Sequence, residues 1–253
     1  MTHPDKKINQ IVILAAGKGT RMKSDIPKVL HEIAGKPMIL HLLETLPDLK
    51  AKKIVIVVGY GKEKVIKVVE DWLVNYPSMK IEFSVQAEQR GTGDAVLSAK
   101  EKLKDDNGYL LVLLGDVPFI KKSTIKKASE KINADQSLSL VMSTKLSDPT
   151  GYGRIYRNGN GLIQRIIEEK DATAEQKKIC EINTGVFIYE NSSLWRYIDM
   201  IQTNNAQQEY YLTDLIDIYN QDNQPVSSYL SEDSNQFCGI NSPEQLLEVE
   251  KAL

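Results

Sequence analysis

Cysteine, histidine and tryptophan are scarce in this 253-residue chain, which has 2, 3 and 2 of them, respectively. Cys180 and Cys238 belong to no CxxC pair, so both a disulfide framework and a structural zinc site are disfavoured. No apolar run approaches the ~20 residues of a membrane-spanning helix. Residues 1–10 are polar and lack the apolar core of a signal peptide. We therefore expect a soluble, cytoplasmic protein without a membrane partner.

An excess of charge of one sign is also missing. The chain has 32 lysines and arginines against 34 aspartates and glutamates, which gives a formal net charge of -2. Because nucleic-acid-binding surfaces are basic, we expect no nucleic-acid partner. The balance does not argue against a small anionic ligand, whose binding needs only a local pocket of donors and cations.

The first half of the chain alternates apolar runs with amphipathic segments. The apolar runs predict buried strands at residues 11–14, 54–58 and 109–114, and a further strand is expected at 81–85. Helices are expected between them, at about residues 37–46, 63–73 and 94–103. This rhythm implies right-handed crossovers, and it predicts an α/β fold with a mainly parallel central sheet.

The second half has a different pattern. Residues 155–157 and 162–167 flank an Asn-Gly-Asn-Gly turn, which predicts a hairpin. A further strand is expected at 182–189 and helices at 192–201 and 211–219. Ser242 and Pro243 begin another helix, with Gln245 able to close a capping box. No Gly/Ser/Pro linker separates the halves, so we expect a single domain, residues 1–253, with a smaller β-rich insertion.

A turn of small residues follows the first predicted strand and comprises Leu14, Ala15, Ala16, Gly17, Lys18 and Gly19. Successive backbone N–H groups of such a turn can bind an anion. The turn would lie at the carboxyl edge of the sheet, where open α/β folds bind ligands. By itself, the Gly-x-Gly pattern fits a simple tight turn equally well. It is neither a dinucleotide fingerprint, because Met22 replaces a small residue, nor a Walker loop, because no Gly-Lys-Ser/Thr closes it.

Three charged residues near this edge have the chemistry that a polyphosphate requires. Arg21 offers a planar fork of donors and Lys28 a compact positive charge. Asp116 directly follows the apolar strand at 109–114, and a carboxylate in that position is a natural Mg²⁺ ligand. The alternative for Asp116 is a capping or turn role.

Gln86 ends the strand at 81–85, and a Gly91-Thr92-Gly93 turn precedes the next helix. An amide side chain supplies both a donor and an acceptor, so Gln86 and the turn amides can bind the edge of a base. The alternative is a strand–helix turn capped by Asp94.

Together these motifs resemble the pyrophosphorylase half of bacterial bifunctional N-acetylglucosamine-1-phosphate uridylyltransferases. The resemblance runs from about residue 10 to residue 253. Its specific stretches are LAAGKGTRM at 14–22, SDIPKVLHEIAGKPM at 24–38, QAEQRGTGDA at 86–95, GDVPFI at 115–120, DPTGYGRI at 148–155, EEKDAT at 168–173, EINTG at 181–185 and NNAQQEYYLTD at 204–214. The first stretch alone would indicate only the wider sugar nucleotidyltransferase superfamily.

The chain departs from the family in three respects. Leu114 stands where tyrosine is frequent, and Asp94 where histidine is common. The acetyltransferase half, a left-handed β-helix, is missing from the sequence, so we expect neither acetyl transfer nor the trimer that the β-helix builds.

The resemblance implies a Rossmann-like fold, with a nucleotide-binding part at about residues 10–120 and a sugar-binding part with a C-terminal helix at about 121–253. It implies Mg²⁺-dependent transfer of a uridylyl group from UTP to N-acetylglucosamine 1-phosphate, giving UDP-N-acetylglucosamine and pyrophosphate. The implied catalytic residues are Arg21, Lys28 and Asp116, and the implied Mg²⁺ ligands are Asp116 and Asn241. The implied nucleotide-binding residues are Leu14, Ala15, Ala16, Gly17, Gly19, Gln86, Gly91, Thr92 and Gly115. The implied sugar-binding residues are Gly153, Glu168 and Asn183.

Three alternatives compete with this function. The first is the same reaction on another sugar 1-phosphate or nucleoside triphosphate. The second is a non-catalytic nucleotide-sugar sensor, disfavoured because the charged residues that such a protein would lose are present. The third is a dinucleotide-binding oxidoreductase, disfavoured by Met22 and by Gly59-Tyr60-Gly61 where an acid should end the second strand.

Overall fold

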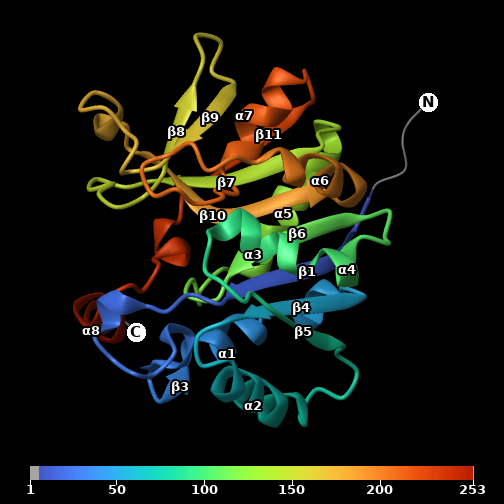
Figure 1. The fold of residues 1–253 in the computed structure, drawn as a ribbon, viewed down its shortest axis with the longest axis vertical. Coiled ribbons are helices and arrows are strands. Elements are labelled where there is room, and N and C mark those ends of the chain that lie inside the picture. The colour runs from blue at the N-terminus through green and yellow to red at the C-terminus, as the bar shows by residue number, and fades with distance from the viewer. Residues whose placement is uncertain (1–5, 253) are drawn as a thin grey trace.

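The computed structural model describes residues 6–252, and within them nine strands form one sheet in the order β11-β7-β10-β6-β1-β4-β5, with β8 and β9 attached through β10 (Figure 1). Four strands of the first half, β1 (Ile8–Ala15), β4 (Lys53–Val58), β5 (Ile81–Val85) and β6 (Tyr109–Leu114), run parallel to one another. This confirms the predicted α/β fold with a mainly parallel central sheet.

The second half extends the same sheet. β10 (Glu181–Glu190) runs antiparallel to both β6 and β7 (Ser139–Lys145), and β11 (Val226–Ser231) lies parallel to β7 at the edge. The predicted hairpin is β8 (Arg154–Arg157) with β9 (Ile163–Ile167), which projects beyond the main sheet in Figure 1. A separate two-stranded ribbon pairs β2 (Glu32–Ile33) with β3 (Lys36–Pro37).

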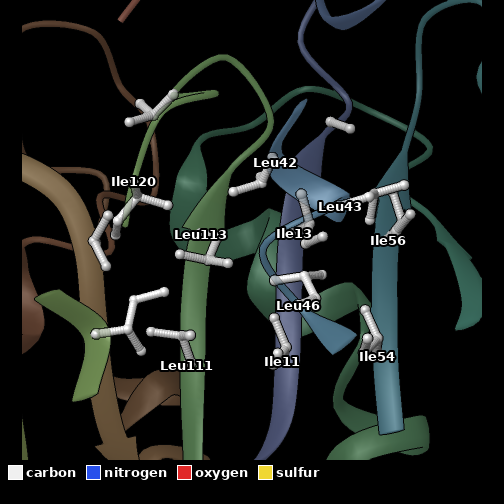
Figure 2. Packing of buried hydrophobic residues seen from close by; sticks show 14 of the residues in the cluster. Ile11, Ile13, Leu42, Leu43, Leu46, Ile54, Ile56, Leu111, Leu113 and Ile120 are labelled. Atoms are coloured by element: carbon white, nitrogen blue, oxygen red, sulfur yellow. The ribbon is translucent and has the colours of Figure 1, made fainter. Parts of the chain in front are cut away.

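Helices cover both faces of the sheet. One core packs α1 (Met38–Leu43), α2 (Lys62–Leu73) and α5 (Lys122–Ala134) on one face, and the other packs α3 (Thr92–Ser98), α4 (Lys100–Leu103), α6 (Asn191–Tyr197) and α7 (Asp214–Gln221) on the opposite face. Alternate β1 residues serve the two cores, with Ile11 and Ile13 in the first and Val12 in the second. Figure 2 shows Ile11 and Ile13 in the cluster that contains Leu42, Leu43 and Leu46. Burial on both faces explains the apolar runs of β1, β4 and β6.

Some boundaries differ from the prediction for identifiable reasons. The helix expected at 94–103 breaks at Ala99, where the Ser98 carbonyl accepts a hydrogen bond from the Ser84 hydroxyl (2.5 Å). The helix expected at 211–219 begins only at Asp214, after a turn in which the Asp214 N–H donates to the Tyr211 carbonyl (3.2 Å) and the Leu212 N–H donates to the Thr92 hydroxyl (3.0 Å). The helix expected at 192–201 ends at Tyr197 and continues as a 3₁₀ turn.

The final helix, α8 (Pro243–Ala252), begins where Ser242 and Pro243 predict. The Ser242 hydroxyl accepts the Gln245 N–H (3.3 Å), while the side-chain amide oxygen of Gln245 accepts the N–H of Asn241 (2.7 Å). The second bond reaches one residue further back than a standard capping box, and it ties the start of α8 to Asn241. No helix within residues 6–252 is long and apolar enough to cross a membrane.

Candidate active site

Two adjoining cavities lie at the carboxyl edge of the parallel strands. The first, of about 330 Å³, is lined by the turn after β1 and by the segment between β5 and α3. The second, of about 240 Å³, lies toward the β8–β9 hairpin and β10. Leu14, Thr92, Leu114 and Asp116 line both cavities, so the two spaces share a common wall.

Most of the predicted nucleotide-binding residues line the first cavity: Leu14, Ala15, Ala16, Gly17, Gln86, Gly91 and Thr92. Gly17 has open space where a Cβ would be, with no atom within 4 Å, so its backbone is accessible to a ligand.

Gly19 and Gly115 do not line either cavity. Gly19 has a φ of +63°, and a Cβ there would approach the Lys28 Cβ to 2.6 Å. A Cβ on Gly115 would approach Val29 to 2.9 Å. Both glycines therefore permit close packing of the segment that carries Lys28.

Arg21, Lys28, Asp116 and Asn241 converge at the boundary between the cavities. Lys28 Nζ donates hydrogen bonds to the Asp116 carboxylate and to Asn241 Oδ1 (2.5 Å), and Arg21 donates to the same Asn241 oxygen (2.8 Å). A backbone bond from Ile240 N–H to the Asp116 carbonyl (3.1 Å) holds the two distant segments together. The Lys28 and Asp116 side chains are only 14% and 20% exposed, which limits screening of their attraction.

The residues present here fit Mg²⁺. Asp116 and Asn241 contribute a carboxylate and an amide oxygen that already share one cation, the Lys28 ammonium. Residues 6–252 contain no group of three or more His, Cys, Asp or Glu side chains suited to a metal. A site with only two protein oxygen ligands suits Mg²⁺, because this ion takes its remaining ligands from phosphate and water.

Comparison with known proteins identifies the family of the chain. A family model described as nucleotidyl transferase matches residues 10–251. The chain belongs to the nucleotidyl transferase family. It is also 40% identical over 245 residues to the bifunctional protein GlmU of Streptococcus mutans, covering 97% of this chain and 52% of the relative.

Other relatives give the same result. Identity is 40% over 230 residues to the bifunctional protein GlmU of Enterococcus faecalis (91% and 48% of the two chains) and 39% over 240 residues to that of Bacillus subtilis (95% and 51%). The chain thus spans about half the length of the curated relatives it matches. The family resemblance drawn from the motifs is confirmed.

The three predicted sugar-binding residues of this nucleotidyl transferase lie together in the second cavity. The N–H of Asn183 donates to the Gly153 carbonyl (2.8 Å), which joins β10 to the start of β8. A Cβ on Gly153 would lie 3.3 Å from both carboxylate oxygens of Glu168. Burial raises the pKa of Glu168, and the Thr213 hydroxyl donates to its Oε1 (2.9 Å).

Several residues at the second cavity were missed as candidates, among them Tyr152, Leu212 and Thr213. Thr213 lies in the NNAQQEYYLTD stretch, so a family signal for it was present. Arg154, only 1% exposed, pairs with Glu169 (2.7 Å) and donates to the Tyr152 carbonyl. These contacts fix the loop that carries Gly153, and no local sequence pattern predicts them.

Proposed function

We propose that this nucleotidyl transferase moves a uridylyl group from UTP to N-acetylglucosamine 1-phosphate, releasing pyrophosphate and using Mg²⁺. The observation that supports this most directly is the shared wall of the two cavities. Asp116 lies in that wall, and Arg21, Lys28 and Asn241 surround it. A donor in the first cavity and an acceptor in the second would therefore meet at the cations.

The central problem of this reaction is electrostatic. A pair of unit charges 4 Å apart repels by about 4 kcal/mol at an effective dielectric constant of 20, against ~1 kcal/mol in bulk water. Two phosphate groups present several such pairs. Arg21 and Lys28 would offset this repulsion, and Mg²⁺ held by Asp116 and Asn241 would supply further positive charge at the phosphates.

The chemical step then needs little from the protein beyond positioning. A phosphate oxygen of the sugar phosphate forms a bond to the α-phosphorus of UTP. The bond from that phosphorus to the bridging α–β oxygen breaks, and pyrophosphate leaves with the electron pair. Because the attacking phosphate is already ionised, no general base is required, and positioning with charge stabilisation suffices.

The second cavity is lined by polar side chains that can bind the acceptor sugar. Glu168 is a half-buried acceptor that is held by one hydroxyl, from Thr213, which leaves carboxylate capacity for a sugar hydroxyl. Asn183 and the backbone at Gly153 lie beside it. We assign the sugar to this cavity and the nucleoside to the one lined by Gln86 and Gly17.

A substrate panel tests the proposal. Pyrophosphate release would be measured with UTP, CTP, ATP and dTTP against the 1-phosphates of N-acetylglucosamine, glucose and N-acetylgalactosamine, with and without Mg²⁺. We expect UTP with N-acetylglucosamine 1-phosphate to be the best pair, and only with the metal. A clear preference for another pair would replace the named substrates, and no release from any pair would overturn the proposed activity.

Asp116→Ala supplies the matching test of the site. This variant should lose most activity together with its response to Mg²⁺. Asp48→Ala is the control, because Asp48 is an exposed acid paired with Lys122 (2.6 Å) outside both cavities. Unchanged turnover in Asp116→Ala would exclude Asp116 as a metal ligand.

A further inference from the structure

The amide of Gln86 is held in one orientation. The side chain is 5% exposed at the end of β5. Its nitrogen donates to the Gly91 carbonyl (3.1 Å) and to Oδ2 of Asp94 (2.8 Å). Both partners are acceptors only, so rotating the amide by half a turn would set its oxygen against a carbonyl and a carboxylate.

This orientation determines what Gln86 presents to a ligand. Both hydrogens of the amide nitrogen are used, whereas Oε1 accepts no hydrogen bond from any residue between 6 and 252. Gln86 lines the first cavity. The side chain therefore offers that cavity an acceptor and has no donor left.

The Asp94 carboxylate is itself held in place by Arg90. Arg90 donates to its Oδ1 (2.7 Å), the oxygen that Gln86 leaves unused. The Arg90 guanidinium lies over the Tyr210 ring, 5.7 Å from its centre, and the Tyr210 carbonyl accepts the Gly93 N–H (2.7 Å). The Asp94 side chain is 11% exposed, so water competes little for the two bonds it accepts.

We propose that Asp94 is a positioning residue that, fixed by Arg90, keeps the Gln86 oxygen toward the base and so makes the first cavity select uracil over cytosine. The ring nitrogen N3 of uracil carries a proton and can donate to Oε1. The same nitrogen in cytosine is an acceptor and would face another acceptor. This inference rests on the proposed function and specifies how its nucleotide is chosen.

The expected size follows from leaving a buried acceptor unpaired. The penalty corresponds to about tenfold to hundredfold in kcat/KM for UTP over CTP. Asp94→Asn should reduce that ratio by about tenfold, because its amide can turn a donor toward Gln86 and favour the reversed Gln86 orientation. The loss should fall mainly on the KM values of the two nucleotides, with kcat for UTP changing much less.

The test compares UTP with CTP in the wild type, Asp94→Asn and Glu88→Gln. Glu88 is the matched control. Its carboxylate is 77% exposed, lies 3.9 Å from Arg90 Nε, and has no hydrogen bond to Gln86. Its variant should keep the wild-type ratio. An Asp94→Asn protein that folds, as judged by its melting temperature, and keeps the wild-type ratio would overturn the inference.

Arg90→Gln covers the case in which Asp94→Asn fails to fold. Arg90 is 56% exposed, so its replacement should be tolerated, and releasing Asp94 should lower the UTP-to-CTP ratio by about threefold. An unchanged ratio in this variant would likewise count against the positioning role. Failure of the proposed function can be told apart from failure of the positioning role. In the first case the wild type itself would not release pyrophosphate from UTP, whereas in the second it would do so and only the UTP-to-CTP ratio of the variants would stay unchanged.

Discussion

Replacing Lys28 by methionine should have opposite effects on metal binding and on turnover. In the ligand-free protein the Lys28 ammonium lies between the Asp116 carboxylate and Asn241 Oδ1, the two oxygens that we assign to Mg²⁺. The metal must displace this ammonium before it can bind both oxygens. Lys28→Met removes this ammonium from both oxygens, keeps the packing of most of the side chain, and leaves Arg21 as the remaining donor to Asn241 Oδ1.

The magnitude follows from the contacts. A hydrogen bond to a charged group contributes about 1.5–3 kcal/mol, and the low exposure of this pair reduces screening by water. If metal binding must break one such bond, its loss should tighten divalent-ion binding to the ligand-free protein by about tenfold to hundredfold. Turnover should fall by roughly 10²–10³, as it does when one preorganised charge stabiliser is removed.

Binding of Mn²⁺, followed by electron paramagnetic resonance without nucleotide, would measure the first effect, and pyrophosphate release the second. Lys36→Met is the control, because Lys36 pairs with Glu44 (2.8 Å) in a similar lysine–carboxylate contact at neither cavity. Weaker or unchanged Mn²⁺ binding in Lys28→Met would refute the argument that the ammonium competes with the metal.

Three further predictions concern the two cavities. Arg21→Ala should lower kcat by roughly 10²–10³, measured by pyrophosphate release, and a loss below about threefold would contradict its role at the phosphates. Gly153→Ala should raise KM for the sugar phosphate by about fivefold or more but leave KM for UTP near the wild-type value, because the added methyl would crowd Ile166 (3.0 Å) and Glu168 (3.3 Å). Burial and nearby Glu168 raise the pKa of Asp214 to about 6, so its ionisation should cost folding stability as the pH rises from about 4 through 6. Asp214→Asn should therefore be more stable than the wild type at pH 8 but not at pH 4, and chemical denaturation showing no such pH dependence would reject this.

The sequence alone was sufficient for β1, β4 and β6 because these strands are buried on both faces. It also predicted β5, which is partly exposed at the sheet edge, but it missed the buried strand β7. A continuous apolar run such as residues 109–114 is typical of a strand that is covered on both faces, and nearly all of these residues are buried. Once those strands are parallel, Gly17 and Asp116 must meet at one edge, so part of the site followed from the fold. β11 was not predicted, because its serine-rich sequence VSSYLS has no apolar run and it lies at the sheet edge.

Contacts between distant residues could not be derived from local pattern. Arg21 and Asn241 are 220 positions apart, and their bond depends on the Ile240–Asp116 backbone contact. Only the family resemblance suggested Asn241. Gly19 shows a limit of assigning roles from a motif. The motif placed Gly19 with the nucleotide-binding residues, whereas in the structure its lack of a Cβ allows Lys28 to pack closely against it.

The way the β8–β9 hairpin is attached to the sheet has a consequence for how such enzymes diversify. The chain leaves β7 and re-enters β10 at neighbouring points, where Lys145 pairs with Glu181 and the Leu146 N–H binds the Cys180 carbonyl (3.0 Å). A segment with adjacent ends can be exchanged without opening the scaffold that holds it. Exchange of residues 146–180 would replace Glu168 and the wall around it, while Asp116 and Lys28 stay in place.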